Sequence, residues 1–183
     1  RITGSVEFYN KKTKDLISRV DIAPGANFDI ALSTNVGNIT NNGVEFTLNT
    51  IPVKTKNFSW DFGFNVTYNK NEITNLVVNP DPNFKGIEVS GISGGTGNNI
   101  GKHVVGYAPY TYNVYKQVYD PKTGMPLEGV YEDINRDGQI TSEDRYFYKK
   151  PAHDVLLGIN TQVAYKSWSL GLAAHGAFGG YLY

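Results

Sequence analysis

Residues 60–69 alternate strictly between large apolar side chains and polar or small ones, and this pattern constrains the fold more than any other feature of the chain. The apolar set is Trp60, Phe62, Phe64, Val66 and Tyr68, and the intervening set is Asp61, Gly63, Asn65, Thr67 and Asn69. Because successive side chains of a β-strand point to opposite faces, a period of two predicts a strand with one apolar and one polar face. A length of about ten residues with an aromatic residue at each end is typical of a tilted membrane-crossing strand.

The same alternation predicts two hairpins. The first covers about 44–69, with its turn at 51–57, and the second covers about 155–178, with a tight turn at Lys166 and Ser167. Weaker alternation predicts further strands, around Val6 and Phe8 and around Phe28, Ile30 and Leu32. The chain is therefore expected to be all-β, with antiparallel strands.

A long connection, about 70–154, separates the two hairpins. Its glycine-rich stretch 91–97 lacks the Lys-Ser/Thr ending of a phosphate-binding loop, and we interpret it as a mobile surface loop. Tight turns on one side and a long excursion on the other are typical of outer-membrane β-barrels. We therefore interpret residues 1–183 as a single barrel segment whose external loop region is 70–154.

Charge and composition exclude several classes of function. Lys+Arg and Asp+Glu are both 17, so the net charge is +0, and no field is present to attract nucleic acid. There is no cysteine for disulfide or thiolate chemistry, and His103, His153 and His175 form no metal or catalytic spacing. The sequence therefore does not indicate an enzyme.

The segment 133–144 has oxygen-bearing residues at the spacing of a calcium-binding loop. The candidate ligands are Asp133, Asn135, Asp137, Gln139 through its backbone carbonyl, Thr141 and Asp144. Gly138 occupies the sixth place, where the loop turns sharply, and Asp144 is shorter than the usual glutamate at the twelfth. We therefore expect a weak Ca²⁺ site, with an Asx-rich turn that binds no metal as the alternative.

Five tyrosines lie close together within the long connection. They are Tyr107, Tyr110, Tyr112, Tyr115 and Tyr119. Such rings form a stacking platform for sugars or peptides, or they pack a strand or line the rim of a barrel. The sequence leaves both interpretations open.

Several segments together resemble the SusC/RagA branch of TonB-dependent outer-membrane receptors of Bacteroidetes. They are residues 9–16, 35–46, 60–69, 71–76, 131–141, 168–170 and the Gly179-Gly180 pair. The resemblance covers nearly the whole chain. It implies a fragment from the C-terminal part of a 22-stranded transmembrane β-barrel, a multi-pass protein of the bacterial outer membrane.

The resemblance also implies a function. Such receptors import nutrients, either glycans or oligopeptides, with energy from TonB and with a SusD-like surface lipoprotein as partner. The turns 51–57 and 166–167 would face the periplasm, and 70–154 would face outwards, near the substrate and the lipoprotein, with the cation loop as a brace. No transport residue can be assigned within this chain.

The rival interpretation is a soluble calcium-stabilised β-sandwich that binds carbohydrate. The two differ in the apolar face of 60–68, which would face lipid in the transporter and a second sheet in the sandwich. An isolated segment with such a face is expected to oligomerise or to pack that face against itself.

Overall fold

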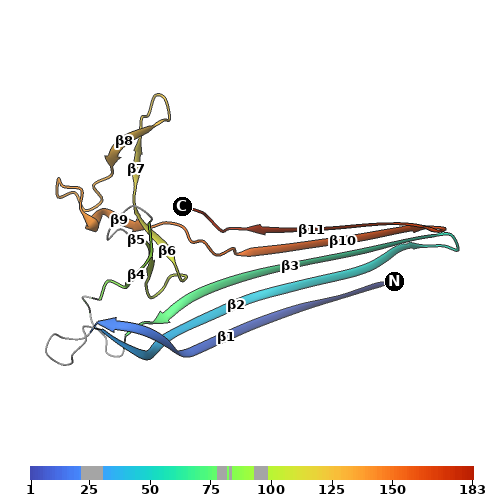
Figure 1. Ribbon diagram of the computed structural model, residues 1–183. Coiled ribbons are helices and arrows are strands. Elements are labelled where there is room, and N and C mark those ends of the chain that lie inside the picture. Colours follow the sequence, from blue (N-terminus) through green and yellow to red (C-terminus); the bar gives the residue numbers. More distant parts are fainter. Residues whose placement is uncertain (22–30, 78–81, 83, 93–98) are drawn as a thin grey trace.

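The computed structural model describes residues 1–21, 31–77, 82, 84–92 and 99–183, and almost all of its regular structure is β-strand (Figure 1). The five long strands are β1 (Ile2–Asp21), β2 (Ala31–Lys54), β3 (Phe58–Asn75), β10 (Val155–Tyr165) and β11 (Trp168–Phe178). They form one antiparallel sheet in the order β1-β2-β3-β10-β11, which is open rather than closed into a barrel. The prediction of an all-β antiparallel fold is confirmed.

The strands before the long connection extend beyond the ten-residue alternating segment that the sequence analysis identified. β2 has 24 residues and β3 has 18. The apolar alternation ends at Tyr68, but β3 stays paired with β2 as far as Asn75, because backbone hydrogen bonds need no apolar side chain. The turn between these strands is correspondingly short, 55–57, and not 51–57. Leu32 lies in β2, whereas Phe28 and Ile30 lie outside the described residues.

The connection between β3 and β10 carries sheets of its own. β4 (Ile87–Gly91), β5 (Asn99–His103), β6 (Thr111–Tyr115) and β9 (Arg145–Phe147) form a four-stranded sheet in the order β4-β5-β6-β9. β7 (Gln117–Tyr119) and β8 (Pro126–Tyr131) form a separate hairpin, and a 3₁₀ turn, η1 (Ser142–Asp144), precedes β9. Of the glycine-rich stretch, Gly91 ends β4, and 93–97 lie outside the described residues.

The small sheets gather at one end of the long sheet, opposite the turns 55–57 and 166–167 (Figure 1). Ile73 of β3 fastens them there. Its amide donates to Tyr107 O and its carbonyl accepts from Gly106 N, both at 2.9 Å, and its side chain is buried. The described core is concentrated at this junction rather than within the long sheet.

No second sheet covers the apolar face of the long sheet in the described part of the chain. Leu170 and Leu172 of β11 are 75% and 65% exposed, and Trp168 is 80% exposed. The structure therefore contradicts the expectation of a self-packed sandwich, and with it the rival interpretation of a soluble β-sandwich.

Candidate functional site

The register of the long sheet aligns the apolar sides of its strands into one continuous face. Phe64 of β3 lies opposite Leu48 of β2 and Ile159 of β10, and two residues further on Val66 lies opposite Phe46 and Leu157. The residues between them form the other face, where Asn65 pairs with Thr47 and Gly158. One sheet thus separates an apolar from a polar environment.

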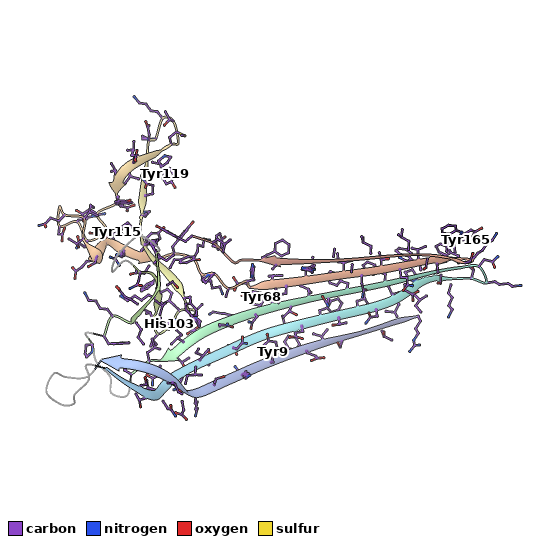
Figure 2. All side chains as sticks on the ribbon, in the orientation of Figure 1. Tyr9, Tyr68, His103, Tyr115, Tyr119 and Tyr165 are labelled. Atoms are coloured by element: carbon purple, nitrogen blue, oxygen red, sulfur yellow. The ribbon has the colours of Figure 1, made fainter. Side chains whose placement is uncertain are left out.

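Aromatic side chains border the apolar face at both ends. At the end near the small sheets, one row of paired positions contains Phe8, Val44, Tyr68, Val155 and Phe178. At the opposite end, Tyr165 pairs with Phe58 and with Trp168. Figure 2 shows Tyr165 at the turn end of the sheet and Tyr68 further along it towards the small sheets. Phe58 and Tyr68 are ten residues apart, about 33 Å along a strand, and a tilt of about 40° reduces this to the ~25 Å of a lipid-facing band.

The polar face is hollowed. Two cavities of about 560 and 260 Å³ lie over it. Asn49, Gly63, Asn160 and Ala173, from strands β2, β3, β10 and β11, line both. A sheet that is concave on its polar side can enclose a water-filled space and place its apolar side outwards.

Glycines on the polar face make room for larger residues on neighbouring strands. Asn160 lies across from Gly63, and Asn65 lies across from Gly158. Tyr9 lies across from Gly43, and its hydroxyl reaches over that glycine to donate to Asn69 Oδ1 at 3.0 Å. This pairing of an aromatic ring with a cross-strand glycine pins the register of β1, β2 and β3.

The acidic loop 133–144 is folded by hydrogen bonds from backbone amides to its own carboxylates. Asp133 Oδ1 accepts from the amide of Arg136 at 2.6 Å, and its Oδ2 accepts from that of Gly138 at 2.8 Å. Asp137 Oδ1 accepts from Gln139 N at 2.8 Å. Gly138 has φ +83°, a left-handed conformation that explains a glycine at this place.

Asp144 links the beginning of this loop to its end. Its side chain is fully buried and accepts from the amides of Thr141 at 2.8 Å, Ile134 at 2.9 Å and Asn135 at 3.3 Å. These hydrogen bonds, that from Thr141 above all, lower the pKa of Asp144 from its ordinary value. Asp144 is therefore ionised and already engaged by the loop's own backbone.

The predicted cation ligands all belong to this one loop, and the side chains of Asn135 and Asp137 are in contact within it. Thr141 caps η1, because its Oγ1 accepts from Glu143 N at 3.2 Å. Across the described residues, no three histidine, aspartate or glutamate side chains form a group able to hold a metal. The Ca²⁺ site therefore stays a prediction.

The tyrosine cluster is larger than the sequence indicated. Of the five tyrosines between 107 and 119, Tyr112, Tyr115 and Tyr119 line a common cavity, and Tyr107 and Tyr110 lie outside it. Figure 2 shows Tyr115 and Tyr119 among the small sheets, away from the long sheet. The tyrosines that the sequence analysis missed are Tyr131, Tyr146, Tyr148, Tyr181 and Tyr183. They come from three further segments, and no sequence spacing links them.

The histidines are apart, as their sequence positions suggested. His103 packs edge-on against Tyr110, with ring centroids 4.6 Å apart, and burial lowers the pKa of His103. His175 lines the smaller hollow of the polar face, and His153 lies against Gly180.

No helix in the described ranges is long and apolar enough to cross a membrane.

The chain is similar to known receptors over its whole length. TonB-dependent receptor SusC of Bacteroides thetaiotaomicron is 40% identical over 183 residues, which are 100% of this chain and 18% of that protein. TonB-dependent receptor P26 of Formosa agariphila is 29% identical over 195 residues, 100% of this chain and 19% of the relative. The chain thus spans about a fifth of the length of these relatives.

Solved structures share the fold. The RagAB peptide importer in its open-open state superposes with a TM-score of 0.74 at 22% identity, over 98% of this chain and 19% of the other. The RagAB peptide transporter gives a TM-score of 0.70 at 21% identity, with the same coverage. Residues 1–175 match the family model described as TonB dependent receptor-like, beta-barrel. The chain therefore belongs to the β-barrel family of TonB-dependent receptors, outer-membrane proteins, and the predicted resemblance to its SusC/RagA branch is confirmed.

Proposed function

We propose that the chain forms a sector of the barrel wall of a SusC-like nutrient importer of the outer membrane. The observation that carries this proposal is the two-faced sheet, apolar on one side and both polar and hollow on the other. In lipid, every backbone polar group needs a protein partner, which a closed sheet supplies. The apolar side then faces lipid, and the polar side faces the transport channel.

The proposal also assigns the two ends of the long sheet to the two sides of the membrane. The short turns 55–57 and 166–167 face the periplasm, and the small sheets with the acidic loop face outwards. The full-length receptor imports glycans or oligopeptides, takes energy from TonB and works with a SusD-like lipoprotein on its outer surface. The similarity to SusC and to the RagAB peptide importer supports this assignment.

Adjacent residues of β11 test the proposed orientation. Leu172 lies on the apolar side and Gly171 on the polar side, where a Cβ would have no neighbour within 4 Å. Leu172→Cys and Gly171→Cys are made separately in the full-length receptor, freed of other cysteines, and each is labelled with bimane. In liposomes, brominated lipids should quench the label at 172 and leave that at 171 bright. Equal or reversed quenching would contradict the orientation.

We further propose that the loop 133–144 binds Ca²⁺ and that the ion stiffens the outward-facing region. The hydrogen bonds of Asp133 and Asp137 support it, because they already fold the loop and leave less chain entropy to be lost on binding. Calorimetric titration of the full-length receptor should give heat with Ca²⁺ that Asp137→Ala abolishes. Glu143→Ala, which removes a carboxylate outside the proposed ligand set, is the matched control. Absence of heat in the unmodified receptor would remove the proposal.

A further inference from the structure

The tyrosine cavity lies between four segments of the outward-facing region. It has a volume of about 570 Å³, within the range of pockets that bind small ligands. β6, the β7–β8 hairpin, β9 with the residues after it, and the segment 181–183 contribute its walls. Eight of the chain's 13 tyrosines line it: Tyr112, Tyr115, Tyr119, Tyr131, Tyr146, Tyr148, Tyr181 and Tyr183.

The rings hold one another at the cavity wall. Tyr115 and Tyr131 pack with centroids 5.3 Å apart, and Tyr146 and Tyr148 pack at 5.5 Å. Tyr112 Oη donates to Tyr181 O at 2.7 Å, which ties β6 to the final segment. The walls are therefore ordered by contacts between their own residues, so that less freedom is lost when a ligand binds.

The charged residues that line the cavity are two lysines, one of which is paired with a glutamate. No aspartate or glutamate is among its described lining residues, which include Lys116 and Lys149. Lys116 is paired with Glu132 at 2.6 Å. Lys149 Nζ lies 4.6 Å from the ring centre of Tyr181 and has no salt bridge to a described carboxylate. Interaction with the Tyr181 side chain raises the pKa of Lys149, and burial raises the pKa of Tyr146, so the ammonium stays charged and the phenol stays neutral.

We propose that this cavity binds the sugar rings of an oligosaccharide. Tyrosine offers an apolar ring face together with a hydroxyl that donates and accepts, and a sugar ring presents C–H faces and hydroxyls in the same combination. An aliphatic peptide side chain offers no hydrogen-bond partner to the tyrosine hydroxyls, and Val114 and Leu182 are the only aliphatic residues of the described lining. Lys149 takes a sugar hydroxyl, or a carboxylate or sulfate on the sugar. The assignment rests on the proposed function, since it selects glycans from the two classes of nutrient named there.

Tyr148 provides the test, because it is 57% exposed and its replacement should not disturb the core. The full-length receptor is applied to an array of neutral oligosaccharides, uronate- or sulfate-bearing oligosaccharides, and mixed-sequence peptides. The unmodified receptor should retain at least one oligosaccharide. Tyr148→Leu should weaken that retention about fivefold to tenfold, and Tyr148→Phe, which keeps the ring, should stay within about twofold.

Matched variants separate binding from folding. Tyr110→Leu removes a half-exposed tyrosine outside the cavity and should change nothing. If Tyr148→Leu fails to fold, Tyr119→Leu, at a lining residue of β7 that is 58% exposed, makes the same test. Lys149→Gln distinguishes the two ligand types, since it weakens an acidic sugar far more than a neutral one.

The assignment is overturned if the array retains peptides and no oligosaccharide, or if Tyr148→Leu and Tyr119→Leu retain oligosaccharide as the unmodified receptor does. The bimane measurement on Leu172→Cys is independent of these results. If the label at 172 is quenched as expected and the array retains no oligosaccharide, the sugar assignment is removed and the importer proposal stands. Equal or reversed quenching of the labels at 172 and 171 would remove the importer proposal itself.

Discussion

The indole Nε1 of Trp60 donates a hydrogen bond to Thr161 Oγ1 at 2.8 Å, between strands whose partners are 101 residues apart in sequence. Both side chains lie on the apolar side of the long sheet. Thr161 Oγ1 in turn donates to Asp61 O at 3.2 Å. Since lipid offers no hydrogen-bond partner, this chain of hydrogen bonds would let a tryptophan and a threonine occupy the lipid-facing side that we propose.

Loss of the threonine hydroxyl should destabilise the barrel. Thr161→Val keeps the shape of the side chain but leaves the indole N–H of Trp60 without its acceptor. We expect the free energy of unfolding to fall by about 1–3 kcal/mol. Urea unfolding of the full-length receptor in liposomes measures it, with Thr161→Ser as the control that keeps the hydroxyl. Equal stability of the valine and serine variants would show that the hydrogen bond contributes nothing.

The sequence predicted which residues lie on each face of this sheet, but not the hydrogen bonds between side chains of neighbouring strands. Alternation along Trp60–Tyr68 depends on neighbouring residues only, so the apolar and polar sides could be assigned without a structure. The contact between Trp60 and Thr161 depends on which residues of β3 and β10 pair, and no local pattern specifies a register across 101 residues.

The tyrosine cavity and the acidic loop show the same division. Spacing alone predicted the candidate ligands of 133–144, because a loop is a local structure, and their binding of a cation stays a prediction. It could not show that Asp144 is buried and accepts three amide hydrogen bonds. The cavity combines Tyr115 with Tyr131 and Tyr146 with Tyr148 through folding of separate segments, so only three of its eight tyrosines were found beforehand.

Gly43→Ala should destabilise the receptor. A Cβ at this position would lie 2.6 Å from the backbone oxygen of Tyr68 and would overlap the Tyr9 ring. Backbone cannot move aside as a flexible side chain can, so we expect a loss of about 1–3 kcal/mol in unfolding free energy. The control is Gly171→Ala, which meets nothing within 4 Å. Urea unfolding compares the two, and a Gly43→Ala receptor as stable as the control would show that the glycine is not needed for space.

Acid should open the loop 133–144 only at unusually low pH. Amide hydrogen bonds stabilise the ionised form of Asp144, so its pKa in the folded loop lies below the ordinary 3.8. A carboxylate with a lowered pKa stabilises fully above the ordinary value, and that contribution is lost as pH falls through the folded pKa. The amides of Ile134, Asn135 and Thr141 should therefore stay protected from hydrogen exchange at pH 3.8. They should lose this protection only when the pH is lowered further.

Two variants of the same loop check the origin of this pH dependence. Asp144→Asn replaces one accepting oxygen with an amide group, so protection should be weaker at every pH and should no longer respond to acid. Glu143→Gln alters an exposed neighbour and should leave the profile unchanged. Loss of protection above pH 3.8 in the unmodified receptor, or an acid response that survives in Asp144→Asn, would assign the effect to another group.

The lipid-facing side should reject charge where the polar side accepts it. Leu48 and Asn49 are neighbours on β2 that point to opposite faces, and Asn49 lines both hollows of the polar side. Leu48→Arg places a guanidinium near the middle of the apolar band and should cost about 2–4 kcal/mol of stability in liposomes. Asn49→Arg should cost well under half of that, because its charge enters a water-filled hollow. Similar losses in the two variants, measured by urea unfolding, would mean that the two sides of the sheet do not face different solvents.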